Sequence, residues 1–270
     1  MPARKILLGT NWKMNKSQPE AMEYSRRLAA MLSSLQGEER IQTFVIPPFT
    51  SIEAVKGLSQ NRFWVGAQNM HWAEWGAFTG EISAPMLRDL GVNLVLLGHA
   101  ERRQYFNETD EAINKKLRTV LQYDFRPLLC IGERKEEKDY GVERETVSRQ
   151  LRIALKDVKP CDTSGLMIAY EPVWAIGQVG TAADVHYLSK MLAHIRGFLV
   201  EILGENTGAS IPVTYGGSIN QDNAPEILAR SGADGLFVGR AAWEIPGMAQ
   251  LIDICLEAAA HRVELSSPPQ

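Results

Sequence analysis

Short apolar runs recur along the 270-residue chain, and longer stretches separate them. The runs are continuous rather than alternating in polarity, which is typical of strands buried on both faces of a parallel sheet. Apolar residues at helical spacing predict amphipathic helices at 20–35, 142–155, 185–203 and 248–260. The apolar runs predict eight strands, at 6–10, 43–46, 63–67, 94–97, 127–131, 166–170, 211–215 and 235–238.

Eight strand–helix units in about 250 residues indicate the α/β class and a closed (β/α)8 barrel. The competing fold is a doubly wound open sheet, which usually carries a glycine fingerprint after its first strand. The segment 9–13, GTNWK, lacks that fingerprint. Because no linker-like stretch interrupts the pattern, we expect one barrel domain over 1–264 and a disordered tail over 265–270.

Composition narrows the range of partners. Hydrophobic residues make up 45% of the chain, and the net charge is −3, so neither nucleic acid nor an anionic membrane is an expected partner. The three cysteines have no spacing typical of disulfides or metal ligands, and we expect no metal and no cofactor. No apolar stretch reaches about 18 residues, and the N-terminus does not resemble a signal peptide. A cytoplasmic location is therefore expected.

Candidate chemistry lies where the predicted strands end, which is the end of a barrel that holds the active site. Glu171 follows a buried run and precedes a Pro-to-Gly loop that can close over it and expel water. Taken singly, such residues have ordinary explanations: a helix-capping glutamate, a solvated lysine, a structural histidine or a tight glycine turn. Five strand ends nevertheless contribute polar groups or glycine turns, which include Asn11, Lys13, His99, Glu171, Tyr215, Ser218, Gly239 and Arg240.

These groups suit proton abstraction next to a carbonyl. Glu171 would act as the base, while His99 and Lys13 would polarise the carbonyl and stabilise the enediolate. The glycine-containing turns after the seventh and eighth strands offer backbone N–H groups to a phosphate. A phosphorylated substrate is therefore expected.

Several motifs closely resemble signatures of the triosephosphate isomerase family. They are NWKMN at 11–15, GAQN at 66–69, GAFTGEI at 76–82, GHAERR at 98–103, AYEPVWAIG at 169–177 and YGGS at 215–218. The resemblance implies that Glu171 shuttles the proton and that a neutral His99 is the electrophile. It also implies that Lys13 supplies positive charge and that Asn11 holds the substrate.

The resemblance extends to the substrate's phosphate and to the subunit arrangement. Substrate contacts are expected from Gly177, Ser218, Gly239 and Arg240, and supporting roles from Glu101 and Tyr215. Glu101 is expected to pair with Lys13 or Arg102. The family implies a homodimer, in which Thr79 of the long loop 69–84 reaches the neighbouring subunit's site. The interface would include Met14, Trp72 and Trp75.

The chain departs from the usual family pattern at four places. Ala100 replaces a serine, so a hydroxyl partner for Glu171 is missing. The lid ends in 178–180, QVG, instead of Thr-Gly-Lys. Arg240 replaces a glycine and would either contact the phosphate or point to solvent, and Trp243 replaces a small or aliphatic residue.

These departures resemble a branch of the family that interconverts L-erythrulose 1-phosphate and D-erythrulose 4-phosphate. The alternative substrate pair is dihydroxyacetone phosphate and glyceraldehyde 3-phosphate. A third hypothesis, a phosphate-binding barrel without catalysis, explains the presence of Glu171, His99 and Lys13 less well, because binding alone needs no base.

Overall fold

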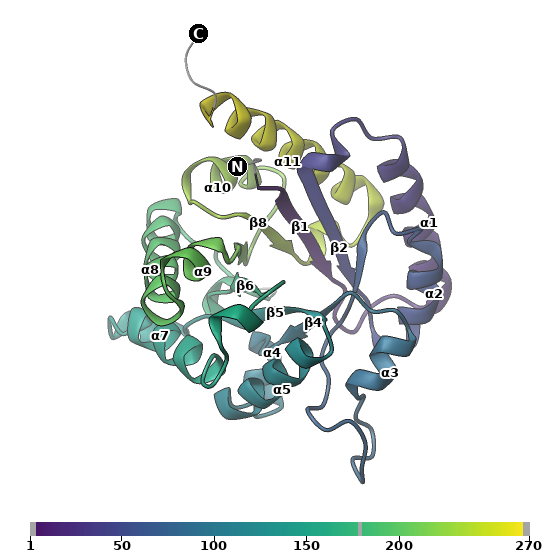
Figure 1. The fold of residues 1–270 in the computed structure, drawn as a ribbon. Helices are drawn as coiled ribbons and strands as arrows, with labels where there is room; N and C mark the ends of the chain where they lie inside the picture. The colour runs from purple at the N-terminus through teal and green to yellow at the C-terminus, as the bar shows by residue number, and fades with distance from the viewer. Residues whose placement is uncertain (1–3, 178–179, 267–270) are drawn as a thin grey trace.

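The computed structural model describes residues 4–177 and 180–266. Within these ranges the strands form one closed parallel barrel in sequence order, surrounded by helices (Figure 1). The predicted α/β class and single-domain (β/α)8 barrel are therefore confirmed. The strands are β1 (Ile6–Asn11), β2 (Ile41–Ile46), β3 (Trp64–Ala67), β4 (Leu94–Leu97), β5 (Arg126–Ile131), β6 (Met167–Tyr170), β7 (Val213–Gly216) and β8 (Gly235–Val238).

The helices fill the connections between these strands. The predicted helix at 185–203 is α8 (Val185–Leu203), while α11 extends further than predicted in both directions. The other α-helices are α1 (Gln18–Ser33), α2 (Ile52–Leu58), α3 (Ala84–Asp89), α4 (Ala100–Tyr105), α5 (Asp110–Gln122), α6 (Lys135–Asp139), α7 (Glu143–Ala154), α9 (Glu205–Ser210) and α10 (Ala224–Arg230), before α11 (Ile245–Ser266). Short 3-10 helices are η1 (Glu38–Arg40), η2 (Phe49–Ser51), η3 (Pro160–Asp162), η4 (Val173–Ala175) and η5 (Arg240–Ala242).

The apolar side chains form two layers of core. The larger cluster lies between the strands and the helices and includes buried Leu8, Val45 and Leu97. A smaller cluster, which includes Phe44 and Phe237, contains side chains from the same strands. Because successive strand residues point to opposite faces, strands such as β1, β2 and β8 supply both layers, which explains why their sequences are continuous apolar runs.

The barrel closes where β1 pairs with β8. The register runs from Leu7 opposite Gly235 to Thr10 opposite Val238. A Cβ atom on Gly235 would lie 2.0 Å from the Leu7 carbonyl oxygen, so this position needs a glycine for the strands to meet. The closure brings the end of β1 beside the turn that follows β8.

The predicted element limits differ from the observed ones by a few residues. β7 begins at Val213 rather than at 211, since Pro212 has no N–H to donate to a ladder. The predicted domain limit at 264 falls inside α11, and residues 267–270 of the expected tail lie outside the described part of the chain. In that described part, no helix is long and apolar enough to cross a membrane.

Candidate active site

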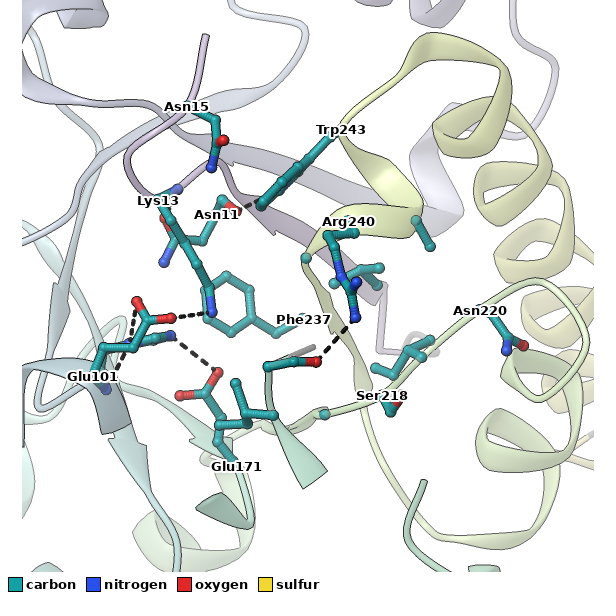
Figure 2. Close-up of a pocket in the computed structure, with 18 residues that line it drawn as sticks. Asn11, Lys13, Asn15, Glu101, Glu171, Ser218, Asn220, Phe237, Arg240 and Trp243 are labelled. Carbon is teal, nitrogen blue, oxygen red and sulfur yellow. Dashed lines mark hydrogen bonds and ion pairs between the residues drawn. The ribbon is translucent and has the colours of Figure 1, made fainter. Parts of the chain in front are cut away.

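A cavity of about 660 Å³ opens at the C-terminal ends of the strands (Figure 2). The turns after β1, β4, β6, β7 and β8 all contribute to its lining. Figure 2 shows Lys13, Glu101 and Glu171 on one side of the cavity and Arg240 and Ser218 on the other. The sequence-predicted residues that line it are Asn11, Lys13, His99, Glu101, Glu171, Gly177, Ser218, Gly239 and Arg240.

His99 is buried and caps the N-terminus of α4. Its Nδ1 accepts a hydrogen bond from the backbone N–H of Glu101, at 3.3 Å. A nitrogen that accepts an N–H carries no proton of its own, so the neutral ring holds its proton on Nε2. Nε2 is also the atom closer to Glu171, at 3.8 Å from Oε1. The start of α4 directly after His99 thus sets the imidazole's orientation.

Lys13 lies in the left-handed backbone region, with φ of 54°. Its backbone N–H donates to Asn11 Oδ1 at 2.8 Å, and its carbonyl accepts from Gln68 Nε2 at 2.8 Å. These two bonds hold a conformation that is costly for a residue with a Cβ atom. The Nζ atom then reaches Glu101 Oε1 at 2.6 Å.

This contact decides which of the two expected cations pairs with Glu101. Glu101 pairs with Lys13, while Arg102 turns to the buried carboxylate of Glu108, with a separation of 3.4 Å. Lys116 and the backbone N–H of Gly98 also bind Glu108. Glu108 therefore supports the turn that carries His99.

Glu171 is 5% exposed and follows β6 directly. Its backbone N–H donates to the Ile131 carbonyl at 2.7 Å. Its Oε2 has no hydrogen-bond partner within the described residues. This agrees with Ala100 standing where a hydroxyl partner was expected. Beneath it, burial raises the pKa of the Cys130 thiol, and the Glu171 carboxylate raises it further.

Another buried carboxylate, Glu133, lies next to the lid and was not predicted from the sequence. It accepts hydrogen bonds from Trp174 Nε1 at 2.7 Å, Tyr187 Oη at 2.8 Å and Tyr170 Oη at 3.0 Å. Burial raises its pKa, although the three bonds oppose that shift. Glu133 follows β5 by two residues, so the strand-end rule that selected Glu171 would also have found it.

Both the backbone and the side chain of Glu133 hold the lid's first turn, η4. Val173 N–H donates to the Glu133 carbonyl at 2.9 Å, and the Lys138 ammonium lies 3.6 Å from the Trp174 ring centroid. Gln178 and Val179, which carry the lid's departure from the family pattern, lie outside the described residues. The described base of the lid is therefore anchored to the turns after β5 and β6.

The opposite end of the cavity suits an anion. Gly177, Ser218 and Gly239 bring backbone from three different turns to it. Arg240 lines the same end, and its Nη2 donates to the Gly177 carbonyl at 3.0 Å. Arg240 is exposed, yet its guanidinium faces the cavity (Figure 2). Contact with the cavity and exposure to solvent were expected as alternatives for Arg240, and its side chain combines the two.

Two predicted residues do not line this cavity. Tyr215 is 1% exposed and packs in the core between strands and helices. Thr79 is exposed on loop 69–84, which extends away from the barrel ahead of α3 (Figure 1). On the same loop Trp75 is 79% and Phe78 45% exposed. Thr79 is thus absent from the site of its own chain.

Several residues without a predicted role also line the cavity, and four of them have large or polar side chains. These are Asn15, Asn220, Phe237 and Trp243. Phe237 forms part of the floor and stacks on Phe44, with ring centroids 5.9 Å apart. Asn15 is the last residue of the NWKMN motif, and Phe237 lies next to the turn after β8. Their positions near strand ends are the sequence feature that could have predicted their place in the cavity.

The fold and the site together define a class: a (β/α)8-barrel protein that brings a carboxylate, an imidazole and an ammonium into one cavity, whose other end is lined by backbone turns and an arginine. A family model described as triosephosphate isomerase matches residues 6–255. The chain belongs to the triosephosphate isomerase family, and the resemblance of its motifs is confirmed. It is accordingly an isomerase of sugar phosphates.

Curated relatives carry two different names. L-erythrulose-1-phosphate isomerase of Mesorhizobium japonicum is 45% identical over 94% of this chain and 97% of its own length. The protein of that name from Rhizobium etli is 42% identical over 98% of this chain and 96% of its own length. Triosephosphate isomerase of Moorella thermoacetica is 42% identical over 93% of this chain and 98% of its own length.

Proposed function

We propose that this isomerase interconverts L-erythrulose 1-phosphate and D-erythrulose 4-phosphate through an enediolate. The observation that carries the proposal is the convergence of Glu171, His99 and Lys13 in one cavity, with His99 Nε2 3.8 Å from Glu171 Oε1. A base, a neutral N–H donor and a cation at one point are the groups that this proton transfer needs.

The proposed reaction begins at the carbon that bears a hydroxyl next to the carbonyl, on the side remote from the phosphate. Glu171 removes the proton from that carbon, the C–H electrons form a C=C bond, and the carbonyl oxygen takes the negative charge. His99 Nε2–H and the Lys13 ammonium stabilise this oxygen. After a proton passes between the two oxygens, Glu171 returns its proton to the former carbonyl carbon.

The anion end would hold the phosphate throughout. Backbone N–H groups of Gly177, Ser218 and Gly239 would donate to it, and the Arg240 guanidinium would add a charge-assisted contact. Asn11 would hold the sugar part near Lys13. Supporting roles fall to Glu101, which binds Lys13, and to Tyr215 as packing.

The substrate assignment rests on two supports. Relatives named L-erythrulose-1-phosphate isomerase reach 45% and 42% identity, and three of the chain's four departures from the family pattern lie at the lid or shortly after β8. L-erythrulose 1-phosphate is dihydroxyacetone phosphate with one more hydroxymethyl group, so the same groups serve both. The second candidate is the triose pair, because a relative named triosephosphate isomerase is also 42% identical.

We further propose a cytoplasmic homodimer in which loop 69–84 enters the neighbouring subunit. Met14 is 96% and Trp75 79% exposed, and a soluble monomer rarely leaves such an apolar patch open. Thr79 would then complete the partner's site, which agrees with its distance from the site of its own chain.

The test is a paired measurement of kcat/KM for both substrates on one enzyme preparation. We expect faster conversion of the four-carbon ketose phosphate and measurable conversion of the three-carbon one, because one added carbon changes discrimination by only about 1–3 kcal/mol. A clear preference for dihydroxyacetone phosphate would replace the tetrulose assignment with the triose one. A lack of turnover of either compound would refute both.

A further inference from the structure

Trp243 links the turn after β8 to the end of β1. Its indole Nε1 donates to the Asn11 backbone carbonyl at 2.9 Å, although the two residues are 232 positions apart. Trp243 directly follows η5 and also lines the cavity. Figure 2 shows its ring beside Asn11, with the hydrogen bond between them.

Among the described residues, the β1–β8 pairing stops before it reaches this carbonyl. The Trp12 N–H donates to Ile46 of β2 at 3.1 Å, and in a planar trans peptide the carbonyl of Asn11 points the opposite way, towards β8. The β1–β8 ladder ends one residue earlier, where Thr10 pairs with Val238. The indole N–H therefore replaces the ladder bond that the end of β8 cannot supply.

Asn11 in turn holds Lys13. The Asn11 side-chain oxygen accepts the Lys13 N–H at 2.8 Å, and Lys13 keeps a left-handed backbone that nearby bonds must maintain. The Lys13 ammonium then reaches Glu101. A hydrogen-bonded path thus runs from the Trp243 indole to the cation of the site.

We propose that Trp243 is a positioning residue, which holds Asn11 and thereby places the Lys13 ammonium in the cavity. Its kinetic consequence rests on the proposed function, whereas its effect on the Lys13 backbone does not. Trp243 itself touches no reacting atom in this proposal.

The same turn offers a matched control. Tyr24 Oη donates to the Ala242 carbonyl at 2.7 Å, next to Trp243, but this bond leads to α1 rather than to Asn11. Trp243→Phe and Tyr24→Phe each remove one hydrogen-bond donor from this region and keep an aromatic ring. Only the first change breaks the path to Lys13.

The experiment compares both variants with the wild-type chain by hydrogen exchange and by steady-state kinetics. In Trp243→Phe we expect the Lys13 amide to exchange about fivefold faster, the factor that corresponds to one ordinary hydrogen bond. We also expect kcat to fall about tenfold with little change in KM, because slight misplacement of a catalytic group slows the chemical step. Tyr24→Phe should show neither effect.

A double variant separates positioning from general loss of structure. Asn11→Ala already breaks the bond to Lys13, so adding Trp243→Phe to it should cost much less kcat than in the wild-type background. Equal losses in both backgrounds would overturn the proposal. So would unchanged exchange at Lys13 in Trp243→Phe, and this readout stays decisive even where the wild-type chain converts neither ketose phosphate.

Discussion

His99 Nε2 lies 3.8 Å from Glu171 Oε1, although the two residues follow strands β4 and β6, which are not neighbours in the barrel. The separation is longer than a hydrogen bond, so neither group is bound to the other. Both are at most 5% exposed. A buried carboxylate and a buried imidazole that lie this close and line one cavity are placed to act on neighbouring atoms of one bound molecule.

Glu171→Gln should lower kcat by at least ~10²-fold, the usual contribution of a positioned general base. The amide keeps the size of the side chain but cannot accept the proton. Steady-state kinetics checks this, with Glu226→Gln on the exposed face of α10 as the matched control. Near-wild-type turnover of Glu171→Gln would exclude Glu171 as the base.

His99→Asn should lower kcat roughly 10²–10³-fold, because the Nε2–H that stabilises the enediolate is lost. His186→Asn, an exposed change near the start of α8, should have no such effect. The measurement is kcat and KM for the same substrate. If only KM changed, His99 would be a binding residue and not the electrophile.

Arg240→Gln should raise KM roughly tenfold, a loss that one solvated charge-assisted hydrogen bond explains. Inorganic phosphate should also inhibit this variant less strongly than the wild type. Arg230→Gln removes a surface cation of α10 that pairs with Glu226, away from the cavity, and serves as the control. Unchanged phosphate inhibition would limit Arg240 to its bond with Gly177.

Trp75→Asp should shift the protein from dimer to monomer. Sedimentation at micromolar concentration should find about twice the chain mass of 30.1 kDa for the wild type and the single-chain mass for the variant. Tyr140→Asp is matched in exposure, at 81% against 79%, but lies outside loop 69–84. A wild-type protein that sediments only as single chains contradicts the homodimer.

The melting temperature of Glu133→Gln relative to that of the wild type should be higher at pH 8 than at pH 4. Burial raises the folded-state pKa of Glu133 above its ordinary value of 4.5. Below that value both states are protonated; as pH rises from it to the raised folded pKa, the unfolded state ionises while the buried carboxyl keeps its proton, so the folded state loses stability. The amide of the variant does not ionise, so the melting-temperature difference should grow with pH, while Glu226→Gln should show no such growth.

Much of this arrangement was accessible from the sequence. The continuous apolar runs predicted strands buried on both faces, and the closed barrel confirms them because eight strand–helix units leave few other ways to bury such strands. The same logic collected Lys13, His99 and Glu171, since parallel strands place all their C-terminal ends at one end of a barrel. Their positions in one cavity follow from chain order alone.

The pairing of side chains was decided only by the tertiary structure. The sequence left Lys13 and Arg102 as possible partners of Glu101. The left-handed backbone of Lys13 directs its ammonium to Glu101 and so decides between them. Glu133 gathers Tyr170, Trp174 and Tyr187 from three elements.

Trp243 meets Asn11 only because the β1–β8 ladder ends at Thr10. Such contacts depend on strand register, peptide orientation and side-chain rotamers, which a linear pattern of polar and apolar positions does not encode. The sequence by itself therefore determined the barrel and which residues stand at its strand ends, whereas the tertiary structure determined how those residues hold one another in place.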